Sequence, residues 1–315
     1  MGFLHPVLKT PFLSAVFLVA AGSVLMAQNA ARRSDAAARV AENVDRVQAA
    51  ATTVTRDVAE QADVDLGEQQ SVEARSGLLG LYGGADTGLF YTSNANLSKT
   101  GGQGDMYFFA RGAAGLHPHV GGGLFLDGFV AQEVFEYARF SNLDFLKFSA
   151  GGGVDYVVPA THGLVASVKY KYERFLDTGS LDEFFVNNAL EVGLAKEFSL
   201  NDIHAVQVGW KSSFSLYAVP DFVRRDEHTF WLGWRWRFLE PLELQVYNFL
   251  SLYYYPNMSG RFDVTNYSGA SLNVALTRWA QLSASAGFAV NSSTQSIFNY
   301  TAANVGGALS LYLSF

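Results

Sequence analysis

The chain has 315 residues, of which 49% are hydrophobic and only 16% are charged, and its formal net charge is −7. The negative charge argues against a nucleic-acid-binding protein, because such proteins carry basic patches. The sequence contains no cysteine, which excludes disulfide bonds, thiol catalysis and cysteine-ligated metals.

The first predicted element is an export signal. Residues 12–26 (FLSAVFLVAAGSVLM) are uncharged, follow His5 and Lys9, and precede the small residues of AQNA. This order is typical of a secretory signal peptide, which we predict for residues 1–27. An uncleaved membrane anchor is the alternative, but a spanning helix needs about 20 residues.

Residues 28–76 differ from the rest of the chain because they contain no Phe, Tyr or Trp. Small apolar residues recur there at alternating spacings of three and four, which predicts one stripe of an α-helix. The stripe consists of Ala37, Val40, Val44, Val47, Ala51, Val54 and Val58. Three interpretations of 33–62 stay open: a helix that joins two copies, a helix that docks on a partner or another part of the chain, and a partly disordered linker.

From residue 77 onward the apolar residues recur with a period of two, which is typical of β-strands. In 229–239, Phe230, Leu232 and Trp234 fall on one face, whereas Arg235 and Arg237 fall on the other. The same pattern predicts strands at 79–93, 106–118, 124–137, 145–158, 164–176, 185–199, 203–218, 229–239, 242–256, 264–278, 281–293 and 301–315.

Three features favour a closed transmembrane barrel over a water-soluble sandwich. The strands are long for a sandwich, short turns alternate with longer polar loops, and Tyr and Trp gather near strand ends, as at a membrane–water boundary. A sheet can cross hydrocarbon only when it is closed, because each unpaired backbone group costs several kcal/mol. We therefore predict an all-β fold, a closed antiparallel transmembrane β-barrel of about 12 strands at 77–315, preceded by a short periplasmic α-helix in 28–76. The boundary aromatics are Tyr91, Tyr137, Tyr172, Tyr254 and Tyr255 beside long loops, and Tyr156, Trp236 and Trp279 beside short turns.

The last predicted strand resembles that of bacterial outer-membrane β-barrel proteins, which ends in an aromatic residue preceded by apolar residues at every second position. Leu309, Leu311, Leu313 and Phe315 match this pattern, and Gly307 departs from it. The resemblance covers 77–315. It implies an integral protein of the bacterial outer membrane that contacts lipid and lipopolysaccharide, with the N-terminal segment in the periplasm. It also implies that the barrel assembly machinery reads the last strand.

A second resemblance covers about thirty residues. The stretches GLFYTSNANLS (88–98) and DMYFFARGAAGL (105–116) are similar to the first hairpin of porin-type barrels and of the barrel half of surface-lipoprotein assembly factors. The latter family implies a secretion or lipoprotein-display function. The chain lacks the helical-repeat periplasmic domain that is usual in that family.

The polar face of each strand is expected to line the lumen. Strand parity assigns to it Arg111, Lys147, Asp155, Lys169, Lys171, Glu173, Glu191, Lys211, Arg235, Arg237 and Glu243. Asp86, Asp127 and Glu133 join them on strands of ambiguous parity. Opposite charges nearly balance, and the basic residues of 164–176, 203–218 and 229–239 are expected to cluster on one wall. Inward aromatic residues are expected to narrow the lumen; they are Phe129, Phe135, Trp231, Tyr247 and Phe249.

Two functions fit this pattern. The first is a small porin-like channel for polar solutes, and the alternative is a non-conducting anchor or scaffold whose helix at 33–62 docks a periplasmic partner or joins copies of the chain. We do not expect an enzyme, because the His-x-Ser pattern that outer-membrane phospholipases carry on one outward strand face is absent. His117 and His119 have no third ligand near them in the sequence, so neither a metal nor a cofactor is expected.

Overall fold

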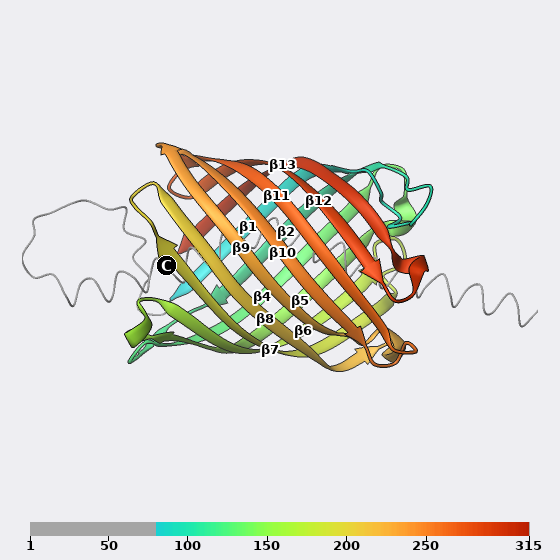
Figure 1. Ribbon diagram of the computed structural model, residues 1–315, viewed down its shortest axis with the longest axis horizontal. Helices are drawn as coiled ribbons and strands as arrows, with labels where there is room; N and C mark the ends of the chain where they lie inside the picture. The colour runs from blue at the N-terminus through green and yellow to red at the C-terminus, as the bar shows by residue number, and fades with distance from the viewer. Residues whose placement is uncertain (1–79, 315) are drawn as a thin grey trace, which may run out of the picture.

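The computed structural model describes residues 80–314, which form one antiparallel sheet closed into a barrel (Figure 1). The ring is complete because β1 pairs with β2 on one side and with β13 on the other, and β2 also pairs with β4. The strands are β1 Leu81–Thr92, β2 Asp105–Leu116, β3 His119–Gly121, β4 Leu124–Tyr137, β5 Phe145–Val158, β6 Leu164–Asp177, β7 Glu183–Ser199, β8 His204–Val219, β9 Asp226–Leu239, β10 Leu242–Tyr255, β11 Arg261–Thr277, β12 Ala280–Ser293 and β13 Tyr300–Ser314. The predicted all-β barrel of twelve long strands is confirmed, and β3 is an additional three-residue strand in the turn after β2.

The period-two pattern decides which face of each strand points outward. On β9, Phe230, Leu232 and Trp234 are 45%, 54% and 37% exposed, although all are large and apolar. Trp231 and Arg235 alternate with them and face the interior, where Trp231 packs on an inward aromatic cluster and Arg235 pairs with Glu197. Apolar side chains exposed on a whole outer surface are unfavourable in water but suit contact with acyl chains. The exterior therefore has the character of a lipid-facing belt.

The connections differ at the two ends of the barrel. Short turns at 159–163, 200–203, 240–241 and 278–279 form what we call the short-turn rim. Loops at 93–104, 138–144, 220–225 and 294–299 lie on the opposite, long-loop rim. None of the helices within residues 80–314 has the length and hydropathy of a membrane-spanning helix.

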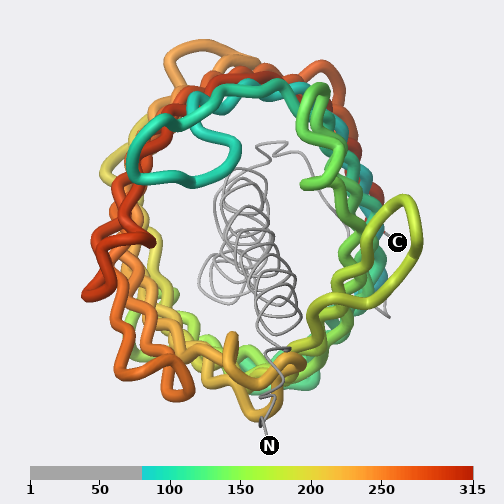
Figure 2. The backbone as a smooth tube through the Cα atoms, turned by 90° about the vertical axis from the view of Figure 1, so that its right-hand side faces the viewer, coloured from blue at the N-terminus to red at the C-terminus, as the bar shows by residue number. Residues whose placement is uncertain are grey.

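The first long loop, 93–104, folds inward across the barrel opening (Figure 2). Asn94 holds it there, because Asn94 Nδ2 donates hydrogen bonds to the carbonyl oxygens of Ser98 at 2.8 Å and of Thr301 on β13 at 2.9 Å. Ala95 in this loop is only 1% exposed and packs on a cluster of inward-facing aromatic residues. We call this the outer aromatic cluster; it contains Phe90, Phe109, Phe135, Tyr137, Phe145, Phe175 and Phe185.

Two of the predicted boundary aromatics face the interior instead. Tyr137 is 6% exposed within the outer aromatic cluster, and Tyr255 is fully buried. Both belong to the inward-facing series of their strands, Tyr137 with Phe135 and Tyr255 with Tyr253. Proximity to a strand end therefore does not identify a residue of the membrane boundary unless its parity is also outward.

Several predictions concern residues outside the described range. They are the signal peptide at 1–27, the helix in 28–76 with its stripe of Val40, Val44, Val47, Val54 and Val58, and the terminal aromatic Phe315. Leu309, Leu311 and Leu313 lie on β13, opposite Thr87, Ala85 and Gly83 of β1. Their recognition by the assembly machinery stays a prediction.

Candidate functional site in the barrel lumen

A continuous series of alternating charges follows the inner wall from β1 to β8. We call it the lumen ladder, and in order of contact it consists of Asp86, Arg111, Glu133, Lys147, Glu173, Lys171, Glu191 and Lys211. Three of the seven contacts in the ladder join residues that lie directly opposite each other in the strand register: Asp86 with Arg111, Arg111 with Glu133, and Glu133 with Lys147. The fold thus places opposite charges side by side.

The first half of the ladder is deeply buried. Arg111 Nη1 lies 3.3 Å from Asp86 Oδ2, and Arg111 Nε lies 3.8 Å from Glu133 Oε1. Lys147 Nζ lies 3.5 Å from Glu133 Oε2 and 3.3 Å from Glu173 Oε1, and the Lys147 side chain is only 3% exposed. Each buried charge of this segment therefore has an opposite charge beside it, as burial of ions requires.

The second half becomes more exposed toward β8. Lys171 Nζ lies 3.0 Å from Glu173 Oε1 and 3.9 Å from Glu191 Oε1. Lys211 Nζ lies 3.6 Å from the same Glu191 oxygen, and the Lys211 side chain is 37% exposed. The ladder therefore runs from a dry segment on β1, β2, β4 and β5 to an accessible cation on β8.

A second charged group lies on β4, β5 and β6. Lys169 Nζ lies 2.7 Å from Asp127 Oδ2 and 2.9 Å from Asp155 Oδ2. His117, in the turn after β2, brings Nε2 to 3.1 Å from the same Asp155 oxygen, and its ring stacks on Phe125 with centroids 4.9 Å apart. Among residues 80–314, no three His, Asp or Glu side chains lie together in a way that could hold a metal ion.

A third charged group, the rim group, lies near the short-turn rim. Arg235 Nη2 lies 2.7 Å from Glu197 Oε1, and Arg235 Nε lies 3.8 Å from Glu243 Oε2. Arg237 Nη2 lies 3.5 Å from the same Glu243 oxygen, and the Arg237 side chain is 53% exposed. Arg237 is the most exposed charge of the rim group.

The expected wall of clustered basic residues is not present. Carboxylates separate the cations: Glu173 and Glu191 flank Lys171, and Glu197 and Glu243 flank Arg235. The physical reason is that like charges held close together on a low-dielectric wall repel each other strongly, whereas alternating charges attract. The lumen therefore has charged groups of both signs and no large basic patch in the described residues.

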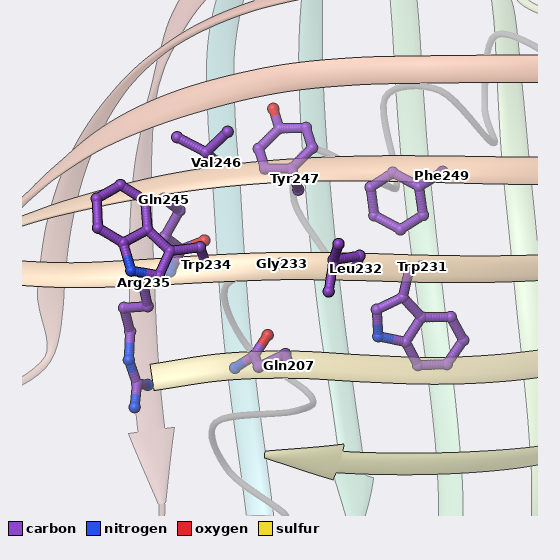
Figure 3. A pocket seen from close by; sticks show the side chains of 10 residues that line it. All are labelled: Gln207, Trp231, Leu232, Gly233, Trp234, Arg235, Gln245, Val246, Tyr247 and Phe249. Atoms are coloured by element: carbon purple, nitrogen blue, oxygen red, sulfur yellow. The ribbon is translucent and has the colours of Figure 1, made fainter. Parts of the chain in front are cut away.

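The wall opposite the ladder is built mainly from rings and uncharged polar groups, with the buried ion pair of Arg261 and Asp263 at the start of β11. Tyr247, Phe249 and Tyr267 pack together, with the Tyr247 and Tyr267 centroids 6.0 Å apart, and Trp231 packs against this group. Figure 3 shows Trp231, Tyr247 and Phe249 beside Gln207 and Arg235 around a small pocket.

Inward-facing glycines let these rings lie against the wall. A Cβ atom at Gly209 would be 2.0 Å from Trp231 Cζ2, and one at Gly269 would be 2.6 Å from a Tyr247 ring atom. The same relation places Phe90 over Gly306 on the neighbouring strand. Each ring occupies the space that a side chain would fill on the next strand, so it extends less far into the lumen than it otherwise would.

Every charged residue that strand parity assigned to the lumen takes part in one of these three charged groups, and so do Asp86, Asp127 and Glu133. The prediction missed Glu197 and His117. Strand parity could have found Glu197, because it lies an even number of residues from Glu191 on β7. No periodic signal could have found His117, because it lies in a turn.

Comparison with known proteins shows similarity at the level of the fold. No protein-family model and no curated protein matches the chain. The COG4313 outer membrane channel from Pseudomonas putida F1 superposes with a TM-score of 0.54 at 10% identity, covering 80% of this chain and 100% of that chain. The translocator domain of the autotransporter NalP from Neisseria meningitidis matches with a TM-score of 0.43 at 10% identity, covering 88% and 97%. An anion-selective porin from Comamonas acidovorans matches with a TM-score of 0.36 at 9% identity, covering 74% and 98%. The superposition on the COG4313 channel shows that the described part of the chain has the fold of bacterial outer-membrane β-barrel proteins.

Proposed function

We propose that this integral outer-membrane-type barrel is a small channel for polar solutes, with the lumen as its path. The observation that carries the proposal is that the ion pairs run along the barrel wall and do not cross the lumen. Among the described residues, every ion pair of the lumen joins groups on one strand, on neighbouring strands, or on strands separated by one other. A plug made by the barrel's own side chains would instead link opposite walls.

The uncharged wall supports the same conclusion. Rings that extended toward the axis of a twelve-stranded barrel would fill much of its interior, since barrels of this size are narrower than the large porins. Because Trp231 and Tyr247 lie over Gly209 and Gly269, they leave more of the lumen to water and solutes. The inward loop 93–104 and the outer aromatic cluster form the narrow part of the proposed path.

The charge pattern favours small polar or zwitterionic solutes over a single class of ion. Alternating Lys and Glu side chains offer hydrogen-bond donors and acceptors at each level of the ladder, and they present no strong net field. Selectivity between cations and anions then depends on the most exposed charge of the three groups. That charge is Arg237 of the rim group, whose side chain is 53% exposed.

Single-channel recording in planar bilayers tests the proposal. The protein should give stepwise conductance, and the double variant Arg235→Gln/Arg237→Gln should shift the reversal potential in a salt gradient toward cation selectivity. One charge about 4 Å from a solute is worth about 1 kcal/mol in water, so the permeability ratio should change by about fivefold. Absence of steps at every voltage would refute conduction.

Arg174→Gln is the matched control. Arg174 also forms an ion pair, with Glu183 at 2.6 Å, but it is 45% exposed and lies on the outward-facing series of β6 beside Tyr170 and Tyr172. Its loss should leave the selectivity unchanged.

A second control deletes residues 28–70. Conductance steps that persist after the deletion would assign conduction to the barrel. Loss of a bound partner with unchanged conductance steps would support the docking role predicted for 33–62.

A further inference from the structure

Three polar side chains interrupt the apolar outer surface where β10 and β11 lie side by side (Figure 1). Asn248 lies between Val246 and Leu250 on β10, which are 42% and 37% exposed. Asn266 and Ser268 on β11 are exposed on the same face. All three belong to the outward series, because the alternating residues Tyr247, Phe249 and Tyr267 pack in the lumen.

The patch lies within the apolar belt and not at its edge. On β11 the outward residues Phe262 and Leu272, which are 37% and 40% exposed, flank Asn266 and Ser268 on either side. Polar groups at this depth have no water to bond, so they are unfavourable unless another group satisfies them.

Hydrogen bonds within the patch satisfy only part of it. Asn248 Nδ2 donates to Asn266 Oδ1 at 3.0 Å and to Ser268 Oγ at 2.8 Å, and Ser268 Oγ donates to Asn266 Oδ1 at 3.4 Å. Among the described residues, no donor reaches Asn248 Oδ1 and no acceptor reaches Asn266 Nδ2. One acceptor and one amide group with two hydrogens therefore face the lipid.

We propose that this patch, which we call the asparagine patch, is the contact surface for a second copy of the same chain in the membrane. The unused groups are complementary to each other: a two-fold axis through the patch brings Asn266 Nδ2 of each copy to Asn248 Oδ1 of the other. A symmetric contact of this kind is the commonest way in which identical chains associate. Lipid tails offer neither a donor nor an acceptor, so only a polar partner removes the penalty.

Small residues at one end of the patch permit close approach there. The next outward residues are Ala270 on β11 and Ala286 on β12, which face each other in the register. Small side chains at membrane contacts let two backbones come near enough for polar groups to bond. Bulky outward residues border the patch on both sides, Phe230 and Trp234 on β9 and Phe288 on β12, so the second copy must contact the patch between them.

Cross-linking in intact outer membranes tests the proposal. Because the sequence contains no cysteine, an introduced cysteine is the only thiol that can react. Ala270→Cys with an apolar bis-maleimide should give a band at twice the mass of one chain. Val168→Cys is the matched control, because Val168 is 47% exposed on the lipid-facing series of β6, away from the patch. It should give no such band.

The decisive variant adds Asn248→Leu and Asn266→Leu to Ala270→Cys. Several lost hydrogen bonds at a membrane contact should lower the cross-linked fraction by about tenfold. Retained heat-modifiable mobility on a detergent gel would show that the barrel still folds. Three results would overturn the proposal: a single-chain mass for Ala270→Cys, equal cross-linking at Val168→Cys, or a cross-linked fraction that the two Leu substitutions leave unchanged.

Discussion

Removal of Lys147 should destabilise the barrel more than removal of any exposed cation in the ladder. At an effective dielectric constant of about 20, a unit charge at 3.3–3.5 Å contributes about 5 kcal/mol of attraction, and Lys147 has Glu133 and Glu173 at these distances. Lys147→Met loses both attractions but also removes the desolvation penalty of a 3%-exposed ammonium group. Glu133 keeps Arg111 at 3.8 Å, and Glu173 keeps Lys171 at 3.0 Å. The free energy of unfolding should therefore fall by about 3 kcal/mol, near the low end of the range for a broken buried ion pair.

Urea-induced unfolding of the barrel in lipid vesicles, followed by tryptophan fluorescence, measures this loss. Lys211→Met is the comparison, because Lys211 also belongs to the ladder but its side chain is 37% exposed and it faces Glu191 at 3.6 Å. Its removal should change the free energy of unfolding by about 0–1 kcal/mol, as for a surface pair. Equal losses of unfolding free energy for the two variants would refute the idea that burial determines how much each ladder cation contributes to stability.

Two further predictions concern other parts of the lumen and the long-loop rim. Gly209→Val should displace the Trp231 ring, which lies 2.0 Å from the new Cβ position, toward the lumen and should lower the single-channel conductance. Unchanged conductance in a folded variant would contradict the inference that the ring packs over Gly209 to keep the lumen open. In the loop before β5, burial raises the pKa of Asp144, assisted by nearby carboxylates and opposed by the hydrogen bond that the backbone N–H of Tyr137 donates at 2.6 Å. A raised pKa means that ionisation costs stability as the pH rises above the ordinary aspartate value of about 4. Asp144→Asn should therefore be more stable than the parent at pH 7 and should lose that advantage on acidification, and a pH-independent difference in unfolding midpoints would contradict this.

The alternation of side chains was enough to predict the strands, because one face of each strand meets lipid along its whole length. Segments such as 145–158, 164–176 and 242–256 fall within one residue of the observed strands at both ends. The pattern left Asp86 uncertain because the neighbouring Gly83, Gly84 and Gly88 carry no side chains that could mark a face. The structure places Asp86 on the inner face because it lies opposite Arg111 in the register of β1 and β2.

The order of contacts in the lumen could not be predicted from single strands. Which cation meets which carboxylate depends on the stagger between strands, and that stagger is a property of the closed sheet and not of any one segment. Glu191, for example, lies opposite Lys169 in the register of β6 and β7, yet it contacts Lys171 and Lys211. Parity predicts which charged residues share one face of a strand, whereas their partners required the three-dimensional arrangement.

The pairing of β1 with β13 has a consequence for how the barrel forms. About 200 residues of chain separate the two strands. Pairing strands so far apart costs loop-closure entropy and raises the contact order, which slows folding. Until Thr87 meets Leu309 across that junction, both strands present unpaired backbone groups that hydrocarbon cannot solvate. Insertion and ring closure are therefore expected to be tightly coupled events, with the open sheet short-lived in the bilayer.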